Sequence, residues 1–224
     1  MKEILTTGFR EAARDYFWLQ EKAYPQRLLY KIVCDRYQLD SFQRVVLYRG
    51  IFPSSENSSR QLKKISSPQQ VNLAVDTHNV VYRLCNYLCG RPVFICSDGL
   101  LRDAGDAFDK DFPFELLDRS LLLLTNYLLS LPLLSVRFLI DKPAYGSAQM
   151  HNFLAEKQAA FPYPASVEET YPADRLMDGP APLAIATADS EIIDRLSCSY
   201  IDLPRLILDR EFSPAFLSIP NILA

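Results

Sequence analysis

Four apolar segments of the chain are each followed, within three residues, by an aspartate. Asp76 follows VNLAV, Asp98 follows PVFIC, Asp141 follows SVRFLI and Asp189 follows PLAIA. Carboxylates that gather in one place repel one another and raise each other's pKa unless a cation neutralises them. Carboxylate oxygens suit Mg²⁺ or Mn²⁺, and such an ion can activate water for attack on a phosphodiester. These residues therefore indicate metal-dependent hydrolysis.

Other polar residues near these aspartates extend the candidate site. Asp103, in CSDGLLRDAGD, and Asp194, one helical turn past Asp189, are candidates for additional ligands. Asn79 follows Asp76 by three residues and can orient that carboxylate or bind a substrate oxygen. The alternative is that each aspartate only caps the helix after its strand, a role that Asp189 in TADSEIID fits well.

The pattern of apolar segments predicts the element order that would position these aspartates. Strands are predicted at 71–75, 92–96, 135–140, 182–186 and 200–208. Crossover helices are predicted at 78–89, 114–130, 147–160 and 190–197, and a Pro-rich loop at 161–182. Alternating strands and helices indicate an α/β fold with a mostly parallel sheet flanked by helices. The carboxyl ends of such strands form the functional edge, so the four aspartates are expected to meet there.

The N-terminal residues 1–52 predict a small helical module. Pro25 suits the first turn of a second helix, and Asp40 with Gln43 gives the capping-box signature of a third. A short turn between these two helices permits a helix-turn-helix-like arrangement. The Ser-, Pro- and Gln-rich residues 53–70 are predicted to be a linker, which leaves 71–224 for the α/β domain.

The charge of the chain is unevenly distributed. Residues 22–64 hold nine Lys/Arg and three Asp/Glu, whereas the whole chain has a formal net charge of −3. A basic module is typical of proteins that meet a polyanion. The candidates for phosphate contacts are Arg44, Arg49, Lys63 and Lys64. The alternative is internal, with ion pairs such as Asp40–Arg44 holding the helices together.

Composition and motifs argue against several other classes of protein. The chain of 224 residues is 49% hydrophobic and 23% charged, as expected of a soluble globular protein. Five Cys and two His, without a CxxC motif, favour free thiols in the cytoplasm over disulfides or zinc. The apolar residues 120–134 are too few to span a membrane, and no signal peptide is evident. There is no G-x-G-x-x-G motif and no P-loop, so dinucleotide binding is not expected. A homo-oligomer is compatible with the sequence.

Two segments resemble a known family. VNLAVDTHNVVYRL resembles the first strand and D-x-x-N turn of PIN-like and NYN-type ribonuclease domains, and LAIATADSEIID resembles their late A-T-x-D-S-x-I-I-D segment. The resemblance covers about residues 70–208. It implies a PIN-like, Rossmann-like sheet and a Mg²⁺- or Mn²⁺-dependent ribonuclease that acts on RNA. The N-terminal CDRYQLDSFQRVVLYRG resembles a helical module of unknown function that accompanies such domains in uncharacterised prokaryotic proteins.

The same resemblance assigns roles to residues. Asp76 matches the ligand on the first strand and Asp189 the late one, while Asp98 and Asp141 fit by their strand-end placement only. Many PIN-like domains also carry a helix-borne acid between these positions, for which the candidates are Asp103, Glu115 and Asp118. Because some members have lost activity, the alternative function is a non-catalytic nucleic-acid-binding or scaffold protein with a degenerate PIN-like domain.

Overall fold

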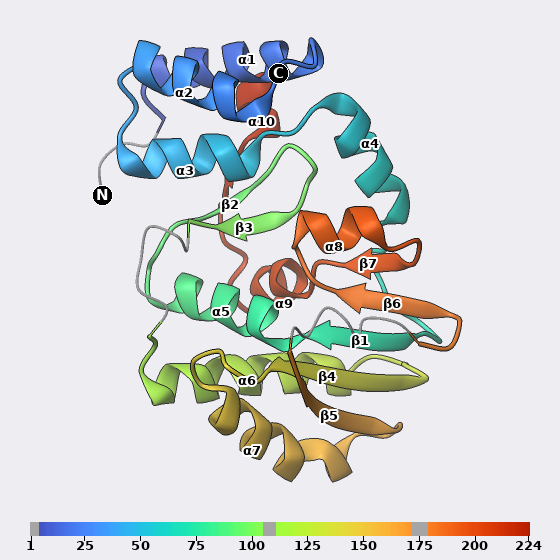
Figure 1. The fold of residues 1–224 in the computed structure, drawn as a ribbon. Helices are drawn as coiled ribbons and strands as arrows, with labels where there is room; N and C mark the ends of the chain where they lie inside the picture. Colours follow the sequence, from blue (N-terminus) through green and yellow to red (C-terminus); the bar gives the residue numbers. More distant parts are fainter. Residues whose placement is uncertain (1–4, 105–110, 172–178) are drawn as a thin grey trace. The chain divides into compact units, whose positions relative to one another are not determined.

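The computed structural model describes residues 5–104, 111–171 and 179–224 (Figure 1). The chain forms two compact units. The helical unit comprises residues 1–62, 91–109 and 215–224, and the sheet unit comprises residues 63–90 and 110–214. These units differ from the predicted division into 1–52, 53–70 and 71–224, because a hairpin from the middle of the chain and its last residues join the N-terminal helices.

The helical unit begins with four helices, α1 (Thr7–Glu21), α2 (Gln26–Arg36), α3 (Ser41–Gly50) and α4 (Ser54–Lys63). The predicted capping box at the start of α3 is confirmed, since the Asp40 side chain accepts from the Gln43 amide and Gln43 bonds back to the Asp40 amide. Helix α4 occupies most of the segment that was predicted to be a linker. Four Ser residues of that segment, Ser54, Ser55, Ser58 and Ser59, therefore lie in a helix rather than in an extended connection.

A small sheet completes the helical unit. It contains β2 (Val93–Ile95), β3 (Leu101–Asp103) and β8 (Leu217–Ser218) in the order β3-β2-β8, followed by the short helix α10 (Pro220–Leu223). Helix α3 ends close to β2, because a Cβ added at Gly50 would lie 3.0 Å from the Phe94 ring. A Cβ at this position would require the Phe94 ring to shift, so Gly50 serves packing as well as helix termination.

The sheet unit is built on five parallel strands in the order β5-β4-β1-β6-β7. The strands are β1 (Asn72–Asp76), β4 (Ser135–Asp141), β5 (Ala165–Thr170), β6 (Leu183–Ala186) and β7 (Ser199–Ile201). The helices are α5 (Thr77–Leu88), α6 (Phe114–Leu129), α7 (Ser147–Lys157, continued by a 3-10 turn at Gln158–Ala160), α8 (Ser190–Arg195) and α9 (Leu203–Phe212). The predicted fold class, a mostly parallel sheet flanked by helices with an N-terminal helical region, is confirmed.

The strand order contains one reversal of direction. From β1 the chain moves outward through β4 to β5, and it then returns to the other side of β1 to form β6 and β7. The reversal therefore falls between β1 and β6, whose arrowheads point to the same side in Figure 1. In open α/β sheets, ligands bind outside the carboxyl ends of the strands at such a switch point.

Three strand predictions need correction. Residues 92–96 do contain a strand, β2, but it belongs to the small sheet of the helical unit. Strand β5 lies within the predicted loop 161–182. The predicted strand 200–208 is instead a short strand, β7, followed by helix α9.

Among the described residues, no helix combines the length and the apolar character that crossing a membrane requires.

Candidate functional site

Asp76 and Asp189 lie on the two sides of the switch point. Asp76 is the last residue of β1 and caps α5, because its Oδ1 accepts from the Asn79 amide at 3.3 Å. Asp189 follows β6 by three residues and caps α8 by accepting from the Glu191 amide at 2.8 Å. Both residues are partly exposed, so their remaining lone pairs can reach a ligand.

Two polar side chains, Thr187 and Asn79, connect the β6–α8 loop to the end of β1 and the start of α5. Thr187 Oγ1 donates to Asp76 Oδ2 at 3.0 Å and accepts from the Asp189 amide at 3.2 Å. Asn79 Oδ1 accepts from the Ala188 amide at 3.0 Å. The threonine of the β6–α8 loop thus positions the aspartate of β1, and the asparagine of α5 positions the β6–α8 loop.

The electrostatics of this pair disfavour two free negative charges. Burial is the main cause that raises the pKa of Asp76, and the charge of Asp189 also raises it. Hydrogen bonds from Thr187 and the Asn79 amide and the charge of Arg83 lower it, and the resulting pKa is about 6. Each oxygen of Asp76 accepts one of these hydrogen bonds, and a carboxylate oxygen has two lone pairs. One lone pair on each oxygen therefore remains for a cation, which fits the carboxylate chemistry of Mg²⁺ or Mn²⁺.

Arg83 is a buried cation next to this pair. It lies on α5, is 2% exposed, and donates from Nη1 to Asn79 Oδ1 at 2.9 Å. Its charge lowers the pKa of Asp76, but this effect is smaller than those of burial, the hydrogen bonds and Asp189. Arg83 therefore fixes Asn79 and offsets part of the negative charge without neutralising it.

Asp141 lies on the same edge, at the end of β4, the neighbour of β1. Its backbone amide donates to His78 Nδ1 at 3.2 Å, and its carbonyl accepts from Ser147 Oγ at 2.7 Å. Because Nδ1 accepts, the proton of the neutral ring is on Nε2, which faces Ser147 Oγ at 3.4 Å. Burial lowers the pKa of His78, and the charge of Asp141 opposes this shift. His78 therefore acts as a neutral anchor for the loop after β4.

Asp202 is a strand-end aspartate that the sequence interpretation missed. It directly follows β7, is 2% exposed, and caps α9 by accepting from the Arg205 amide at 3.2 Å. The signal was present in the sequence, because an aspartate followed two residues later by Pro204 is typical of a helix start. Its burial suits a structural cap better than a ligand.

Asp98 and Asp103 belong to the small sheet of the helical unit rather than to the parallel sheet. Asp98 is fully buried and accepts from Arg60 Nη1 at 3.0 Å and from Arg102 Nη1 and Nη2 at 2.9 and 2.8 Å. Although burial opposes ionisation, the charge and hydrogen bonds of Arg102, with Arg60, keep the pKa of Asp98 below its usual value. Both guanidinium groups also lie over the Phe52 ring. The expected gathering of Asp98 with the other strand-end aspartates is thus wrong, and its carboxylate is engaged by arginines.

The other candidate acids lie on the exposed surfaces of helices α6 and α8. Asp194 is exposed near the C-terminal end of α8, whereas Asp189 caps the opposite end. Glu115 and Asp118 are exposed in the first turns of α6, and Asp118 accepts from Gln149 of α7 at 2.6 Å. Within the described ranges, no group of three or more His, Cys, Asp or Glu is arranged to hold a metal ion. A metal would therefore rest on the Asp76–Asp189 pair.

Two of the expected phosphate-binding residues have structural contacts instead. Lys63 Nζ donates to the carbonyls of Ile193 and Leu196, both at 2.8 Å, and so caps the C-terminal end of α8. Arg44 donates to the Leu39 carbonyl at 2.8 Å and to Asp35 at 3.2 Å. The internal alternative therefore holds for Arg44, with Asp35 as its partner in place of the expected Asp40.

Arg49, Lys64 and Asn79 are the remaining residues that were expected to contact substrate. Arg49 is half-buried and its carbonyl accepts from the Cys96 thiol. Lys64 forms a parallel bridge with Tyr200 at the edge of the sheet. Asn79 is placed as the sequence predicted, beside Asp76, although its oxygen already accepts from Arg83 and from the Ala188 amide.

The fold and the site define an α/β protein with a pair of linked aspartates at the switch point of a five-stranded parallel sheet. By sequence, residues 65–206 match the family described as "Domain of unknown function (DUF5616)", and the chain belongs to this family. Residues 8–63 match the family described as "Protein of unknown function (DUF434)", a match that ends with α4.

One relative extends over both matched regions. The chain is 24% identical over 196 residues to Uncharacterized protein MJ0935 of Methanocaldococcus jannaschii, which covers 87% of this chain and 93% of that protein. The sequence similarity to that relative therefore extends over most of both chains. No solved structure matches the chain.

Proposed function

We propose that the protein is a metal-dependent phosphodiester hydrolase that acts on RNA, with its site at the Asp76–Asp189 pair. The observation that carries the proposal is that two aspartates from separate loops are held together at the switch point, where burial and mutual repulsion raise the pKa of Asp76 to about 6. Such an arrangement is favourable when a divalent cation is bound and unfavourable when it is not.

In this proposal the residues of the site have distinct roles. Asp76 and Asp189 hold a Mg²⁺ or Mn²⁺ ion, which supplies activation of water and stabilisation of charge on a phosphodiester. Thr187 and Asn79 orient the two carboxylates through the hydrogen bonds described above. Asp141 adds negative charge on the same edge, so that the edge attracts cations before any substrate binds.

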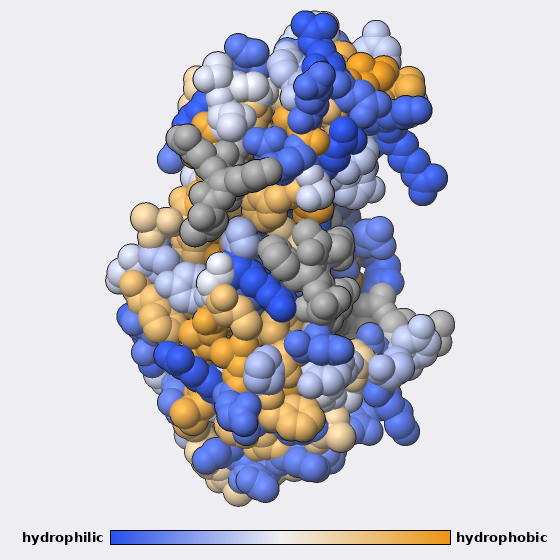
Figure 2. Space-filling model, turned by 90° about the vertical axis from the view of Figure 1, so that its left-hand side faces the viewer, coloured by the Kyte–Doolittle hydropathy of each residue, from blue (hydrophilic) through white to orange (hydrophobic). Residues whose placement is uncertain are grey.

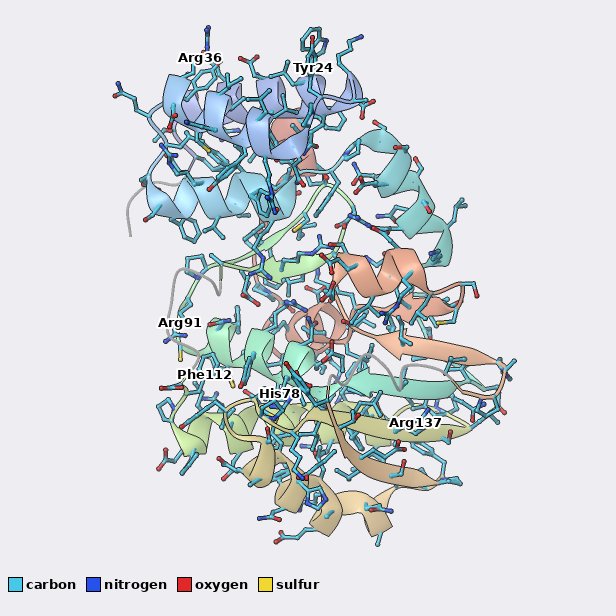
Figure 3. All side chains as sticks on the ribbon, in the orientation of Figure 1. Tyr24, Arg36, His78, Arg91, Phe112 and Arg137 are labelled. Atoms are coloured by element: carbon cyan, nitrogen blue, oxygen red, sulfur yellow. The ribbon has the colours of Figure 1, made fainter. Side chains whose placement is uncertain are left out.

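RNA is proposed as the substrate for two reasons. The first is the resemblance of the segments around Asp76 and Asp189 to PIN-like ribonuclease domains. The second is a set of exposed cations on α2, namely Arg27, Lys31 and Arg36. Figure 3 shows Arg36 and Tyr24 extending outward at the two ends of this helix. These cations replace Arg44 and Lys63 as the proposed phosphate contacts. The five cysteines are free thiols, which supports a reducing, cytoplasmic location for this activity.

A second candidate function is a non-catalytic nucleic-acid-binding or scaffold role. It is favoured by one specific observation, namely that Asp76 and Asp189 both cap helices. An Asn side chain caps a helix nearly as well as Asp but provides no negative charge for a cation. The Asp→Asn substitution therefore separates the two functions.

The test is cleavage of labelled single-stranded RNA in Mn²⁺ by the wild type and by Asp76→Asn and Asp189→Asn. We expect both variants to lose cleavage while retaining the wild-type circular dichroism spectrum. The matched control is Asp194→Asn, which removes one exposed carboxylate from the other end of α8 and should cleave like the wild type. Equal cleavage by the wild type and both site variants would refute the hydrolase and favour the scaffold.

A further inference from the structure

Two exposed aromatic rings lie side by side in the sheet unit. Phe114 begins α6 and Tyr145 lies in the loop between β4 and α7. Their rings stack at an interplanar angle of 15° with centroids 6.2 Å apart, although the residues are 59% and 38% exposed. Burial of such rings is favourable, so a stacked pair that remains in solvent is available to a ligand with its own flat apolar face.

Tyr145 is held rigidly. Its hydroxyl donates to the Phe112 carbonyl at 3.0 Å, and its own carbonyl accepts from the Tyr82 hydroxyl at 2.7 Å. The next residue, Gly146, has a φ of +76°, and a Cβ there would lie 2.9 Å from Leu117 Cδ1. The loop therefore packs closely against α6, which positions the ring of Tyr145 against that of Phe114 before any ligand binds.

The ring pair belongs to the same edge as the aspartates. Tyr145 follows Asp141 by four residues, and Asp141 is bonded through its amide to His78 in the first turn of α5. Tyr82, which holds Tyr145, is six residues after Asp76, a separation of about 9 Å along the helix axis at 1.5 Å per residue. Figure 3 shows His78 at the start of α5 and Phe112 just ahead of α6.

The surface around the rings suits a charged ligand with an apolar face. Lys142 is exposed directly after Asp141 and provides a cation for a phosphate. Figure 2, which views the molecule from the side to which β1 and β6 point, shows hydrophobic and hydrophilic residues interspersed over the surface. A nucleotide offers both a flat base and a phosphate, and a base can stack on an exposed ring only when it is unpaired.

We propose that Phe114 and Tyr145 form a stacking platform for an unpaired base, so that the substrate class is single-stranded RNA. This inference rests on the proposed function, because it assigns the substrate of the same edge. Every base has a π-face, so the platform distinguishes single-stranded from double-stranded RNA but not one base sequence from another. Tyr145 and Phe114 are binding residues in this proposal, and the carboxylates alone hold the cation.

Binding without cleavage tests the platform. Fluorescence anisotropy of a labelled oligouridylate would be measured in EDTA for the wild type, Phe114→Leu and Tyr145→Leu. Because stacking on one aromatic side chain contributes about 1–3 kcal/mol per base, each leucine variant should bind about 5-fold to 150-fold more weakly. Phe114→Tyr and Tyr145→Phe keep the rings and should bind within about 3-fold of the wild type, a difference below 1 kcal/mol. Binding to an RNA duplex should be the same in all variants.

The outcomes separate this platform from the hydrolase. Wild-type affinity for the oligouridylate in both leucine variants, with unchanged thermal stability, would overturn the platform. The platform would also be overturned if the leucine variants had a lower mass in solution than the wild type but the same RNA affinity. The rings would then pack against a second copy of the chain. Weaker binding by the leucine variants together with full cleavage by Asp76→Asn would support the platform and reject the proposed metal site.

Discussion

Replacing Asp76 by Asn should stabilise the metal-free protein at pH 8. In the wild type, the folded protein holds an ionised Asp76 in a site where burial and the charge of Asp189 disfavour ionisation. The amide keeps the shape and the cap of the side chain, because its oxygen can still accept from the Asn79 amide. The variant therefore removes the unfavourable charge, and it also places an NH₂ group where the second carboxylate oxygen accepts from Thr187.

The size of the effect follows from the pKa of Asp76. A rise from 3.8 to about 6 corresponds to about 3 kcal/mol at about 1.36 kcal/mol for each pKa unit. The partial exposure of Asp76 and the loss of the oxygen that accepts from Thr187 Oγ1 reduce this value. We expect a gain of about 1–2 kcal/mol in the free energy of unfolding, or roughly 2–8 °C in Tm for a chain of this size.

The pH dependence has a defined sign. Below about pH 4, Asp76 is protonated in both the folded and the unfolded protein, so it contributes no difference in stability. Between the ordinary value of 3.8 and about 6, the folded protein binds the proton more tightly, so the contribution of Asp76 falls as the pH rises. Above about pH 6 the penalty is complete and constant. The advantage of Asp76→Asn should therefore appear between about pH 4 and pH 6 and persist at higher pH.

The assay is urea unfolding of the wild type and Asp76→Asn in EDTA at several pH values. The pKa of His78 is lowered in the folded protein, so protonation of His78 at low pH destabilises the fold. This contribution is common to both proteins and cancels in their difference. The matched control is Asp194→Asn, which should show no such gain because Asp194 is exposed. A variant that is less stable than the wild type at pH 8 in EDTA, or equally stable at every pH, would refute the argument.

Three further substitutions test the surrounding structure. Asp98→Asn leaves Arg60 and Arg102 without a buried countercharge and should destabilise the helical unit by about 3–5 kcal/mol in urea. The control is Asp35→Asn, which breaks an exposed ion pair and should change the free energy of unfolding by less than about 1 kcal/mol. Thr187→Val removes the hydrogen bond to Asp76 and should raise the pKa of that carboxyl, as measured by NMR titration, while Thr187→Ser should preserve it. Gly146→Ala meets both a φ of +76° and the Leu117 side chain, whereas Gly90→Ala meets only a φ of +70°. Gly90→Ala should cost about 1–2 kcal/mol and Gly146→Ala about 1–3 kcal/mol more in thermal unfolding.

The parts of the fold that sequence could predict were those with strong local patterns. The runs before Asp76, Asp141 and Asp189 are apolar and short, and each forms a strand of the parallel sheet or leads into the loop after one. The Asp40–Gln43 capping box marks the start of α3 because both hydrogen bonds are local. For the same reason, the sequence placed Asn79 correctly beside Asp76.

The parts that failed depend on contacts between distant residues. The segment 92–96 has the same apolar pattern as β1, and only its pairing with β3 and β8 separates it from the parallel sheet. Asp98 could not be distinguished from Asp76 by its local sequence, because its partners Arg60 and Arg102 meet it only in the folded chain. The hydrogen bond between Thr187 and Asp76 joins residues that are 111 positions apart, so no local sequence pattern predicts it.

The central claim is that Asp76 and Asp189 share a divalent cation, and calorimetric titration of Mn²⁺ into the metal-free protein tests it most directly. We expect saturable binding by the wild type at pH 8, with weaker binding below about pH 6 as Asp76 takes up a proton. Asp76→Asn and Asp189→Asn should each lose this binding, and Asp194→Asn should keep it. Binding of Mn²⁺ that is the same in the wild type and both site variants, or no binding by the wild type, would contradict the claim.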